Sequence, residues 1–247
     1  IAPLLLCFLR KTTVAILTAE RNVAPWRRRL YLPTYGVGDA ARYAGITTKT
    51  ILNWQDAEKQ TPVISAREKG VSLNYLQLVE VAFVAALRKA GVKLPQIKNA
   101  RSYIAAKLST EYPFADHRFK TDGKNILMQL DEFVEGESKN KLVITNKGGQ
   151  LAWAEVIDTK FTEFEYDENL AVKWHVAGTD SPVLIDPRVS FGAPMVKGVA
   201  TWAVKGRFDA GEARQDIADD FALDAKDVDY ALKFEGIDLS TLKAWPH

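Results

Sequence analysis

The strongest constraint on the fold lies in residues 37–55, where helical spacing is interrupted by a single turn signal. Small apolar residues in the segment 37–44 predict a short helix that buries Ala40, Ala41 and Ala44. Gly45 suits the left-handed position that ends a helix, and Ile46 is expected to enter the core behind it. Because small side chains let a second helix cross closely, the stretch predicts a helix-turn-helix.

The second helix of this pair is expected to begin at Thr47 or Thr48, since either hydroxyl can cap it. We expect Ile51 and Leu52 to face the core. The other face then carries Lys49, Thr50, Asn53 and Trp54. Short polar side chains and a lysine suit base edges and phosphates, so this face is the predicted DNA-reading surface.

Two other interpretations of the same stretch stay open. Gly36, Gly38 and Ala41 match a loose dinucleotide-binding fingerprint, with Asp56 about twenty residues further on. Against a nucleotide-dependent enzyme, Pro33 interrupts the preceding apolar run, and the helix is shorter than a crossover of roughly ten to twelve residues. The second alternative is a helix pair with a purely structural role.

Charge is divided unevenly along the chain, although the net charge is only +2. Residues 1–110 hold 17 Lys and Arg against 6 Asp and Glu, or +11, whereas residues 111–247 hold 16 against 25, or −9. A basic front half indicates a polyanionic partner, and an acidic rear half points away from one. The alternative is a solvated surface that is merely uneven.

Cysteine and histidine are too sparse for a disulfide or metal framework. The sequence has a single Cys7, and its three histidines, His117, His175 and His247, match no metal-ligand spacing. The sequence contains neither a P-loop nor a Gly-x-Ser-x-Gly elbow. We therefore expect a non-enzyme that uses no cofactor and no metal.

Residues 1–34 are predicted to form an N-terminal extension and basic arm. Residues 1–9 are apolar but far shorter than the ~20 residues that span a bilayer, and no basic start precedes them as in a signal peptide. The expected location is the cytoplasm, without a membrane partner. Arg27, Arg28 and Arg29 can lie along DNA phosphate or form a solvated charge run.

Residues 35–118 are predicted to form a DNA-binding domain around the helix pair. Residues 56–70 are polar and indicate a β-turn or wing that carries Arg67 and Lys69. Ser72 can cap a helix over 73–90, and Pro95 suits the first turn of the next helix. Both helices are expected to be amphipathic, with apolar faces made by Leu76, Val79, Phe83, Ala86, Leu87 and Ala90, and by Ile97, Ala100, Ile104 and Leu108.

This order of elements resembles the DNA-binding domain of MerR-type regulators over about residues 35–108. The resemblance rests on the helix-turn-helix, the wing, a helix with a Leu-Val-Glu run, and Arg-Lys-Ala-Gly-Val-Lys-Leu-Pro-Gln-Ile-Lys at 88–98. That family usually carries Arg-Tyr-Tyr where this chain has Leu52-Asn53-Trp54. The predicted DNA-binding residues are Arg42, Thr47, Thr48, Lys49, Thr50, Asn53, Arg67 and Lys69.

Residues 119–182 change to strand spacing and predict a small antiparallel sheet. Turns are expected at Asp122-Gly123, 146–149 and 167–169, between extended runs at 119–130, 142–145, 151–157, 161–166 and 171–176. The aromatic residues of this region are expected to form its core rather than a ligand cage: Trp153, Phe161, Phe164, Tyr166 and Trp174.

Residues 183–247 carry a second resemblance. Ile185-Asp-Pro-Arg188, Phe191-Gly-x-Pro194, Val196-Lys-Gly198 and Ala210-Gly-Glu212 precede acidic stretches at 216–221 and 224–232. Over about residues 183–236, this pattern resembles the small domain of unknown function numbered four hundred and thirty-three. Members of that family are typically antitoxins, of the VapB-like kind, encoded beside PIN-like ribonuclease toxins. The resemblance therefore implies a toxin-binding module.

Three short helices are predicted in this segment, in an arrangement like a second helix-turn-helix. Gly211 ends the first helix, Asp224 and Asp227 form a capping box on the last, and Gly236 ends it. Aspartates on the last helix, including Asp229, would repel phosphate, so the expected partner is a protein.

The acidic metal site of a PIN-like toxin would attract cations. The predicted toxin-binding residues are therefore the cations Lys197, Lys205, Arg207 and Arg214, with Phe191, Trp202 and Phe208 as apolar anchors. The alternative is that these cations only balance neighbouring aspartates on the chain's own surface.

The sequence thus predicts an α+β chain: a winged helix-turn-helix, a middle antiparallel sheet and a helical terminal module. The leading hypothesis is the antitoxin of a type II toxin–antitoxin pair, which silences a PIN-like ribonuclease and binds operator DNA to repress its operon. A homodimer within a hetero-oligomer is expected, because operators usually pair two half-sites and the helix at 73–90 has apolar surface to spare. The alternative is a MerR-like regulator that senses a small ligand through the β region.

Overall fold

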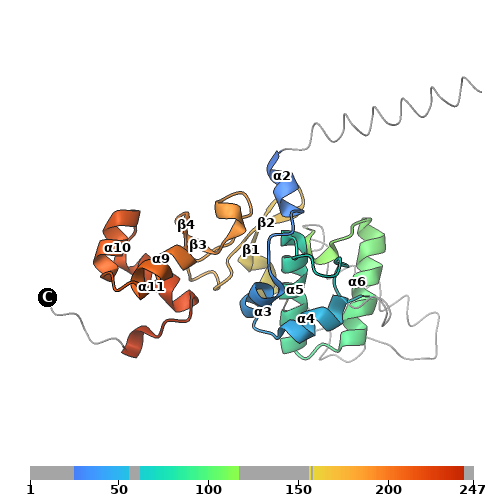
Figure 1. Cartoon of the computed structure of the whole chain (residues 1–247). Helices are drawn as coiled ribbons and strands as arrows, with labels where there is room; N and C mark the ends of the chain where they lie inside the picture. Colours follow the sequence, from blue (N-terminus) through green and yellow to red (C-terminus); the bar gives the residue numbers. More distant parts are fainter. Residues whose placement is uncertain (1–24, 56–61, 117–155, 157, 242–247) are drawn as a thin grey trace, which may run out of the picture.

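The structure is a computed structural model that describes residues 25–55, 62–116, 156 and 158–241 (Figure 1). Helices dominate it, and the strands form two small antiparallel sheets, which confirms the predicted α+β class. The front unit contains α2 (Pro25–Leu30), α3 (Val37–Ala44), α4 (Thr48–Gln55), α5 (Tyr75–Lys89), α6 (Leu94–Leu108), β1 (Phe164–Asp167) and β2 (Leu170–Trp174). The terminal unit, residues 183–241, contains β3 (Met195–Val196), β4 (Val199–Ala200), α9 (Thr201–Asp209), α10 (Arg214–Phe221) and α11 (Ala225–Phe234).

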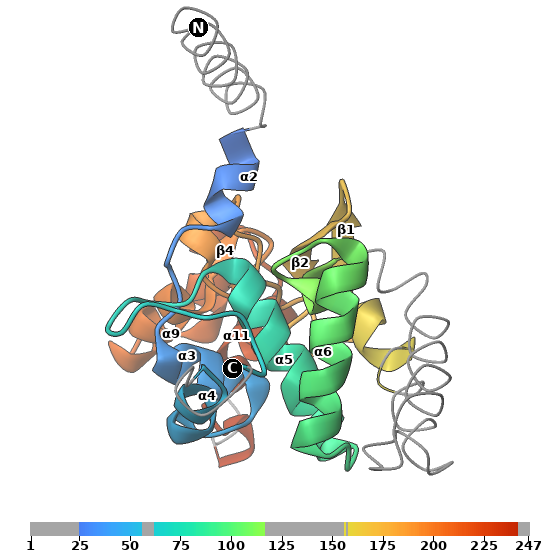
Figure 2. The ribbon, with the colours of Figure 1, turned by 90° about the vertical axis from the view of Figure 1, so that its right-hand side faces the viewer.

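Helix α5 runs through the centre of the front unit (Figure 2). The Asn74 side chain accepts a hydrogen bond from the Gln77 N–H at 2.8 Å, and the Gln77 side chain accepts one from the Asn74 N–H at 3.0 Å. This capping box fixes the start of the helix, so the predicted cap at Ser72 and the start at residue 73 are wrong by two residues.

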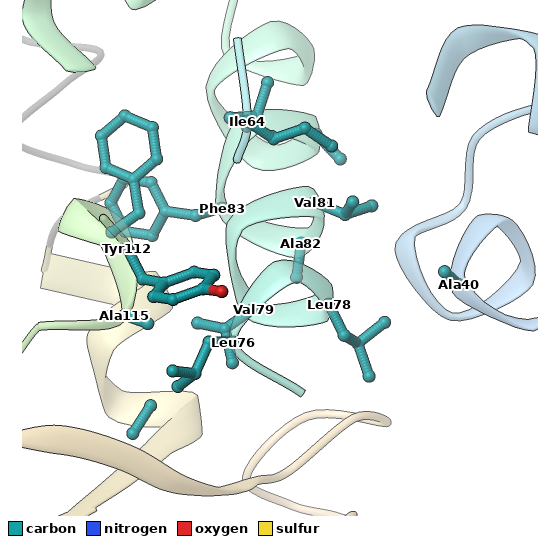
Figure 3. Packing of buried hydrophobic residues seen from close by; sticks show 14 of the residues in the cluster. Ala40, Ile64, Leu76, Leu78, Val79, Val81, Ala82, Phe83, Tyr112 and Ala115 are labelled. Atoms are coloured by element: carbon teal, nitrogen blue, oxygen red, sulfur yellow. The ribbon is translucent and has the colours of Figure 1, made fainter. Parts of the chain in front are cut away.

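The burial of α5 also differs from the prediction. Twelve of its fifteen residues are buried, whereas the sequence pattern predicts one apolar face. Leu76, Val79 and Phe83 point toward Tyr112 and Ala115, while Leu78 and Val81 point the other way (Figure 3). The apolar surface that motivated a homodimer is therefore covered within one chain. The homodimer itself stays a prediction, and it requires a different face.

Helix α6 matches its predicted pattern, with Pro95 in the first turn and buried residues at Ile97, Ala100, Ile104 and Leu108. It also buries Arg101, which donates to the fully buried Glu80 of α5 at 3.2 Å. The Ser65 N–H donates to the same carboxylate at 2.7 Å. This polar group joins α5, α6 and the loop after α4, and it satisfies a charge that burial would otherwise penalise.

Strands β1 and β2 form an antiparallel hairpin at the predicted turn. Glu168 and Asn169 connect them, and both have positive φ values, 44° and 67°. Two successive left-handed residues make the turn that follows the natural twist of a hairpin. The hairpin packs against α5 through β2, and the stacked rings of the buried residues Trp174 and Phe164 lie 5.6 Å apart.

The remaining predictions for the β region are only partly met. Phe161, Phe164 and Trp174 are buried and Tyr166 packs against the same cluster, which confirms their assignment to the core. Val156 lies in a helix rather than a strand, and Phe161–Glu163 form a 3-10 turn, η3, before β1 begins. The predicted strands at 119–130 and 142–145, and Trp153, lie outside the described residues.

The terminal unit has its own core, made by buried residues of its strands and helices: Val183, Val196, Val204, Ile217, Ala218, Leu223, Val228, Ala231 and Leu232. Its three helices agree with the prediction, and Gly211 and Gly236 adopt φ values of 90° and 85° at the ends of α9 and α11. The strands β3 and β4 are joined by Lys197 and Gly198 in a tight antiparallel turn.

The two units are connected by backbone pairing and by side chains. Trp174 exchanges backbone hydrogen bonds with Ile185, and Leu184 exchanges them with Met195, so the ladder passes from the hairpin to the terminal unit. Helix α2 packs across this region, where Arg27 pairs with Glu168 at 2.7 Å and Arg29 donates to the carbonyl of Arg188. None of the helices in the described ranges is long and apolar enough to cross a membrane.

Candidate functional site

The helix pair α3–α4 is the first candidate site. Helix α3 ends at Gly45, which has φ 65° and ψ 36°, and the Ile46 N–H donates back to the Ala41 carbonyl at 2.9 Å. Thr47 then caps α4, because its hydroxyl accepts from the Thr50 N–H at 3.2 Å. The local geometry of the predicted turn is thus present.

The exposed face of α4 differs from the predicted one at two positions. Trp54 is buried, with 5% of its surface exposed, whereas Leu52 is 49% exposed. The prediction placed Leu52 inside and Trp54 outside, which is wrong. Helical spacing alone does not determine which face of an eight-residue helix is buried. The larger indole fills the core beside Ile51. The exposed residues on α4 are Thr48, Lys49, Leu52 and Asn53, with Thr50 half-buried.

The loop between α4 and α5 is held by Arg67. Its guanidinium donates to the Gln55 side chain at 2.9 Å and to the Val71 carbonyl. Lys69 lies exposed in the adjoining turn, at Gly70. Within the described part of this loop, residues 62–73, the only β pairing is the single bridge between Tyr35 and Leu73, so no wing strands are seen there.

Arg42, also predicted to bind DNA, faces the terminal unit. It pairs with Glu235 at 3.2 Å and donates to the Phe234 carbonyl at 3.3 Å. Its guanidinium lies over the rings of Tyr43 and Phe234, at 4.9 and 5.2 Å from their centroids. The other carboxylate oxygen of Glu235 accepts from the buried Thr201 hydroxyl at 2.5 Å. Glu235 thus links the first turn of α9 to α3.

The cations predicted to bind a toxin each have an acidic partner within the terminal unit. Lys197 pairs with Asp224 at 2.8 Å and with Asp227 at 2.7 Å, and these hydrogen bonds raise the pKa of Lys197. The other three cations make four ion pairs: Lys205 with Asp209, Arg207 with Glu212 and with Asp220, and Arg214 with Asp229. These contacts are those expected if the cations balance neighbouring acids.

The predicted apolar anchors divide into two kinds. Phe208 is partly buried against the terminal core. Trp202 and Phe191, by contrast, are 64% and 89% exposed. Phe191 lies in the short turn η4 (Ser190–Gly192), which the sequence did not predict.

A cleft of about 810 Å³ opens between residues 175–182 and the start of α11. Its lining includes His175, Asp180, Lys226 and Tyr230, and it is widely open to solvent. Among the described residues, no cluster of histidine, cysteine and acidic side chains could hold a metal ion.

No protein-family model matches the chain. A Mycobacterium tuberculosis protein named "Putative antitoxin VapB45" is 24% identical over 218 residues, which cover 79% of this chain and 90% of that protein. The crystal structure of Rv2018 from Mycobacterium tuberculosis is similar with a TM-score of 0.67 and 23% identity, covering 81% of this chain and 98% of that one. A TM-score of this size over nearly the whole length of that chain shows that the two proteins share a fold.

Proposed function

We propose that the chain is the antitoxin of a toxin–antitoxin pair, which binds operator DNA and neutralises a PIN-like ribonuclease. The observation that carries this proposal is the similarity to a protein named as an antitoxin, because it spans 90% of that protein. The match covers 79% of this chain, which is more than either unit alone, so it includes parts of both. The role is non-enzymatic, and it belongs in the cytoplasm, where operator and toxin are present.

The operator would be read by the exposed face of α4. Lys49 and Asn53 are exposed there, Thr47 and Thr50 fix the first turn, and the surrounding half of the sequence carries +11. The second helix of such a pair enters the major groove with its N-terminal residues toward the bases. Lys69 would grip phosphate from the adjoining loop.

DNA binding is tested by gel shifts on the DNA upstream of the chain's own gene. Lys49→Ala should weaken binding by about 1–3 kcal/mol, as for a lost base-edge contact. Lys69→Ala should weaken binding to all sequences alike and reduce the slope of log K against log salt by about 1. Lys233→Ala is the matched control and should leave binding unchanged. Lys233 is also an exposed lysine, but it lies on α11, outside the proposed DNA-binding surface. Equal affinity for all three variants and the wild type would remove the DNA assignment.

Neutralisation is tested by adding the full chain to the purified product of the neighbouring gene. Cleavage of RNA by that product in Mg²⁺ should stop at a fixed stoichiometry, and the two proteins should elute as one complex. Undiminished cleavage at a large excess of the chain would overturn the antitoxin role.

A further inference from the structure

Two adjoining cavities lie where α3, α5, β2 and residues 156–163 meet. The larger, of about 440 Å³, is lined by the end of α5 and by residues 156–163. The smaller, of about 140 Å³, is lined by α5, the end of α3, Lys160 and Trp174 of β2. Ala86, Lys89 and Lys160 line both cavities, so the two form one hollow, which we call the α5 recess. The larger cavity alone has the size of a small-molecule site, roughly 300–1,000 Å³.

Most of the lining of the α5 recess is apolar. Helix α5 contributes the small side chains of Ala82, Ala85 and Ala86. Tyr43, which is half-buried, and Trp174, which is buried, add aromatic surface. Flat aromatic rings pack well against aromatic side chains, and an apolar lining with few polar groups is usual for ligand sites.

The charge that is left without a partner in the recess is positive. The Lys160 ammonium pairs with the Glu163 carboxylate at 2.5 Å, and the same carboxylate oxygen accepts from the Trp174 indole N–H at 3.1 Å. Lys89 is exposed, and its ammonium has no ion pair or hydrogen bond with any residue that the structure describes. An ammonium has three N–H donors and forms charge-assisted hydrogen bonds with anionic groups.

The fold holds the walls of the recess in place. The Lys160 ammonium lies 5.9 Å from the centroid of the Trp174 ring, and Trp174 is fixed by backbone hydrogen bonds to Ile185. A ligand would therefore meet a largely preformed surface, which lowers the entropic cost of binding. Because Tyr43 and Ala44 form the end of α3, a bound molecule would contact the helix pair directly.

We propose that the α5 recess binds a small aromatic acid, with a flat apolar body and one carboxylate or sulfonate group. Lys89 pairs with the anionic group, and the alanines and Tyr43 contact the ring system. This inference goes beyond the proposed antitoxin function and does not rest on it, since every residue of the recess belongs to the front unit.

Two fluorescent probes test the chemistry of the site on the full chain. They are 8-anilinonaphthalene-1-sulfonate and its neutral match N-phenyl-1-naphthylamine, which has the same rings without the sulfonate. The chain should bind the sulfonate at one site, and the neutral probe about tenfold more weakly, because the hydrogen bond to the charged group is lost. Equal affinity for both probes, or no saturable binding of the sulfonate up to about 1 mM, would overturn the proposal.

Lys89→Met removes the charge and keeps most of the side chain. Its Kd for the sulfonate should rise about tenfold, while its Kd for the neutral probe stays within about twofold of the wild type. Lys89→Arg should bind the sulfonate within about threefold of the wild type, because a guanidinium also donates to an anionic group. Lys93→Met is the matched control and should leave both Kd values unchanged, since Lys93 is an exposed lysine outside the recess.

Ala86→Phe tests the place of the site, because this side chain lines both cavities and a benzyl group would fill their junction. Both probes should bind at least about tenfold more weakly, with a thermal midpoint that shows the variant is folded. If Ala86→Phe does not fold, the Lys89 variants decide the question. If Lys89→Met binds the sulfonate as tightly as the wild type, the probe sits on another apolar surface and the proposal is wrong. Failure of operator binding or toxin neutralisation would not affect this result, because neither enters the measurement.

Discussion

Glu80 is a carboxylate with no exposed surface in the middle of α5. Its hydrogen bonds with Arg101 and Ser65 offset the cost of burying its charge. Burial raises the pKa of Glu80, while Arg101 and Ser65 oppose that rise. A group whose folded pKa is raised contributes its stability below the unfolded value of about 4.3 and loses it as pH rises through the folded pKa. The ion pair with Arg101 limits this loss.

Arg101→Met should therefore make stability strongly dependent on pH. It leaves a buried carboxylate without its cation, which should lower the free energy of unfolding by about 3–5 kcal/mol near pH 7. The deficit should shrink toward pH 5, where the carboxyl can be protonated in the folded state. Urea denaturation at a series of pH values measures this. The double variant Glu80→Met/Arg101→Met should recover most of the loss, and a single variant as stable as the wild type at pH 8 would contradict the expectation.

Gly192 packs against Tyr35, and substitution there should be costly. Gly192→Ala places a methyl group against the Tyr35 ring at φ 76°, so unfolding free energy should fall by about 2 kcal/mol or more. The Tyr35 hydroxyl has no hydrogen-bond partner among the described residues, so Tyr35→Phe alone should cost little. Thermal denaturation of Gly192→Ala/Tyr35→Phe should show partial recovery. A Gly192→Ala midpoint equal to that of the wild type would refute the close approach.

At the scale of elements, the end of α10 offers a clean test of backbone strain. Its C-cap is Ala222, with φ 53°, a conformation that glycine adopts without penalty. Ala222→Gly should raise the free energy of unfolding by about 1 kcal/mol. Ala210→Gly is the matched control, because the C-cap of α9 has φ −75° and gains nothing from glycine. If both variants are stabilised, or if neither is, the left-handed backbone of Ala222 does not lower the stability of the protein as expected.

Elements specified by neighbouring residues could be predicted from the sequence. Gly45 and the Asp224–Asp227 capping box lie at the helix ends to which the sequence assigned them. The burial of α5 on all sides could not be predicted, because the segments that cover it come from distant parts of the chain. Helical spacing likewise could not decide between Leu52 and Trp54.

In the candidate sites too, features set by neighbouring residues could be predicted, and contacts between distant residues could not. The exposed polar residues of α4 could be predicted from a local pattern. The acids that pair with Lys197 and Arg214 follow 27 and 15 residues later, so no local pattern identified them as partners. The left-handed turn at Phe191 has no signal in its own residues, since neither serine nor phenylalanine favours that backbone; the Tyr35–Gly192 contact supports it from 157 positions away.

At the scale of the whole molecule, Glu235 joins the two units by accepting from Arg42 of α3 and from Thr201 of α9. Arg42→Ala should loosen this connection and leave each core intact. Hydrogen exchange should then speed up at Phe234 and Glu235, without faster exchange in α5. Arg42→Lys should behave in between, since lysine retains the charge but loses the planar stacking on Phe234.

Arg42→Ala also tests the prediction that Arg42 contacts DNA. Because its guanidinium is engaged by the terminal unit, Arg42→Ala should leave the salt slope of operator binding unchanged, unlike Lys69→Ala. A slope reduced by about 1 would return Arg42 to the phosphate-binding set.

The contact between Tyr35 and Gly192 also has an evolutionary consequence. Any lineage that replaces Gly192 must first, or at the same time, accept a smaller side chain at position 35, because the ring and a Cβ atom cannot share that space. In homologues that keep this fold, the two positions should therefore change together, with glycine at 192 wherever a tyrosine stands at 35. The residue at position 35 thereby restricts which substitutions are accepted at position 192.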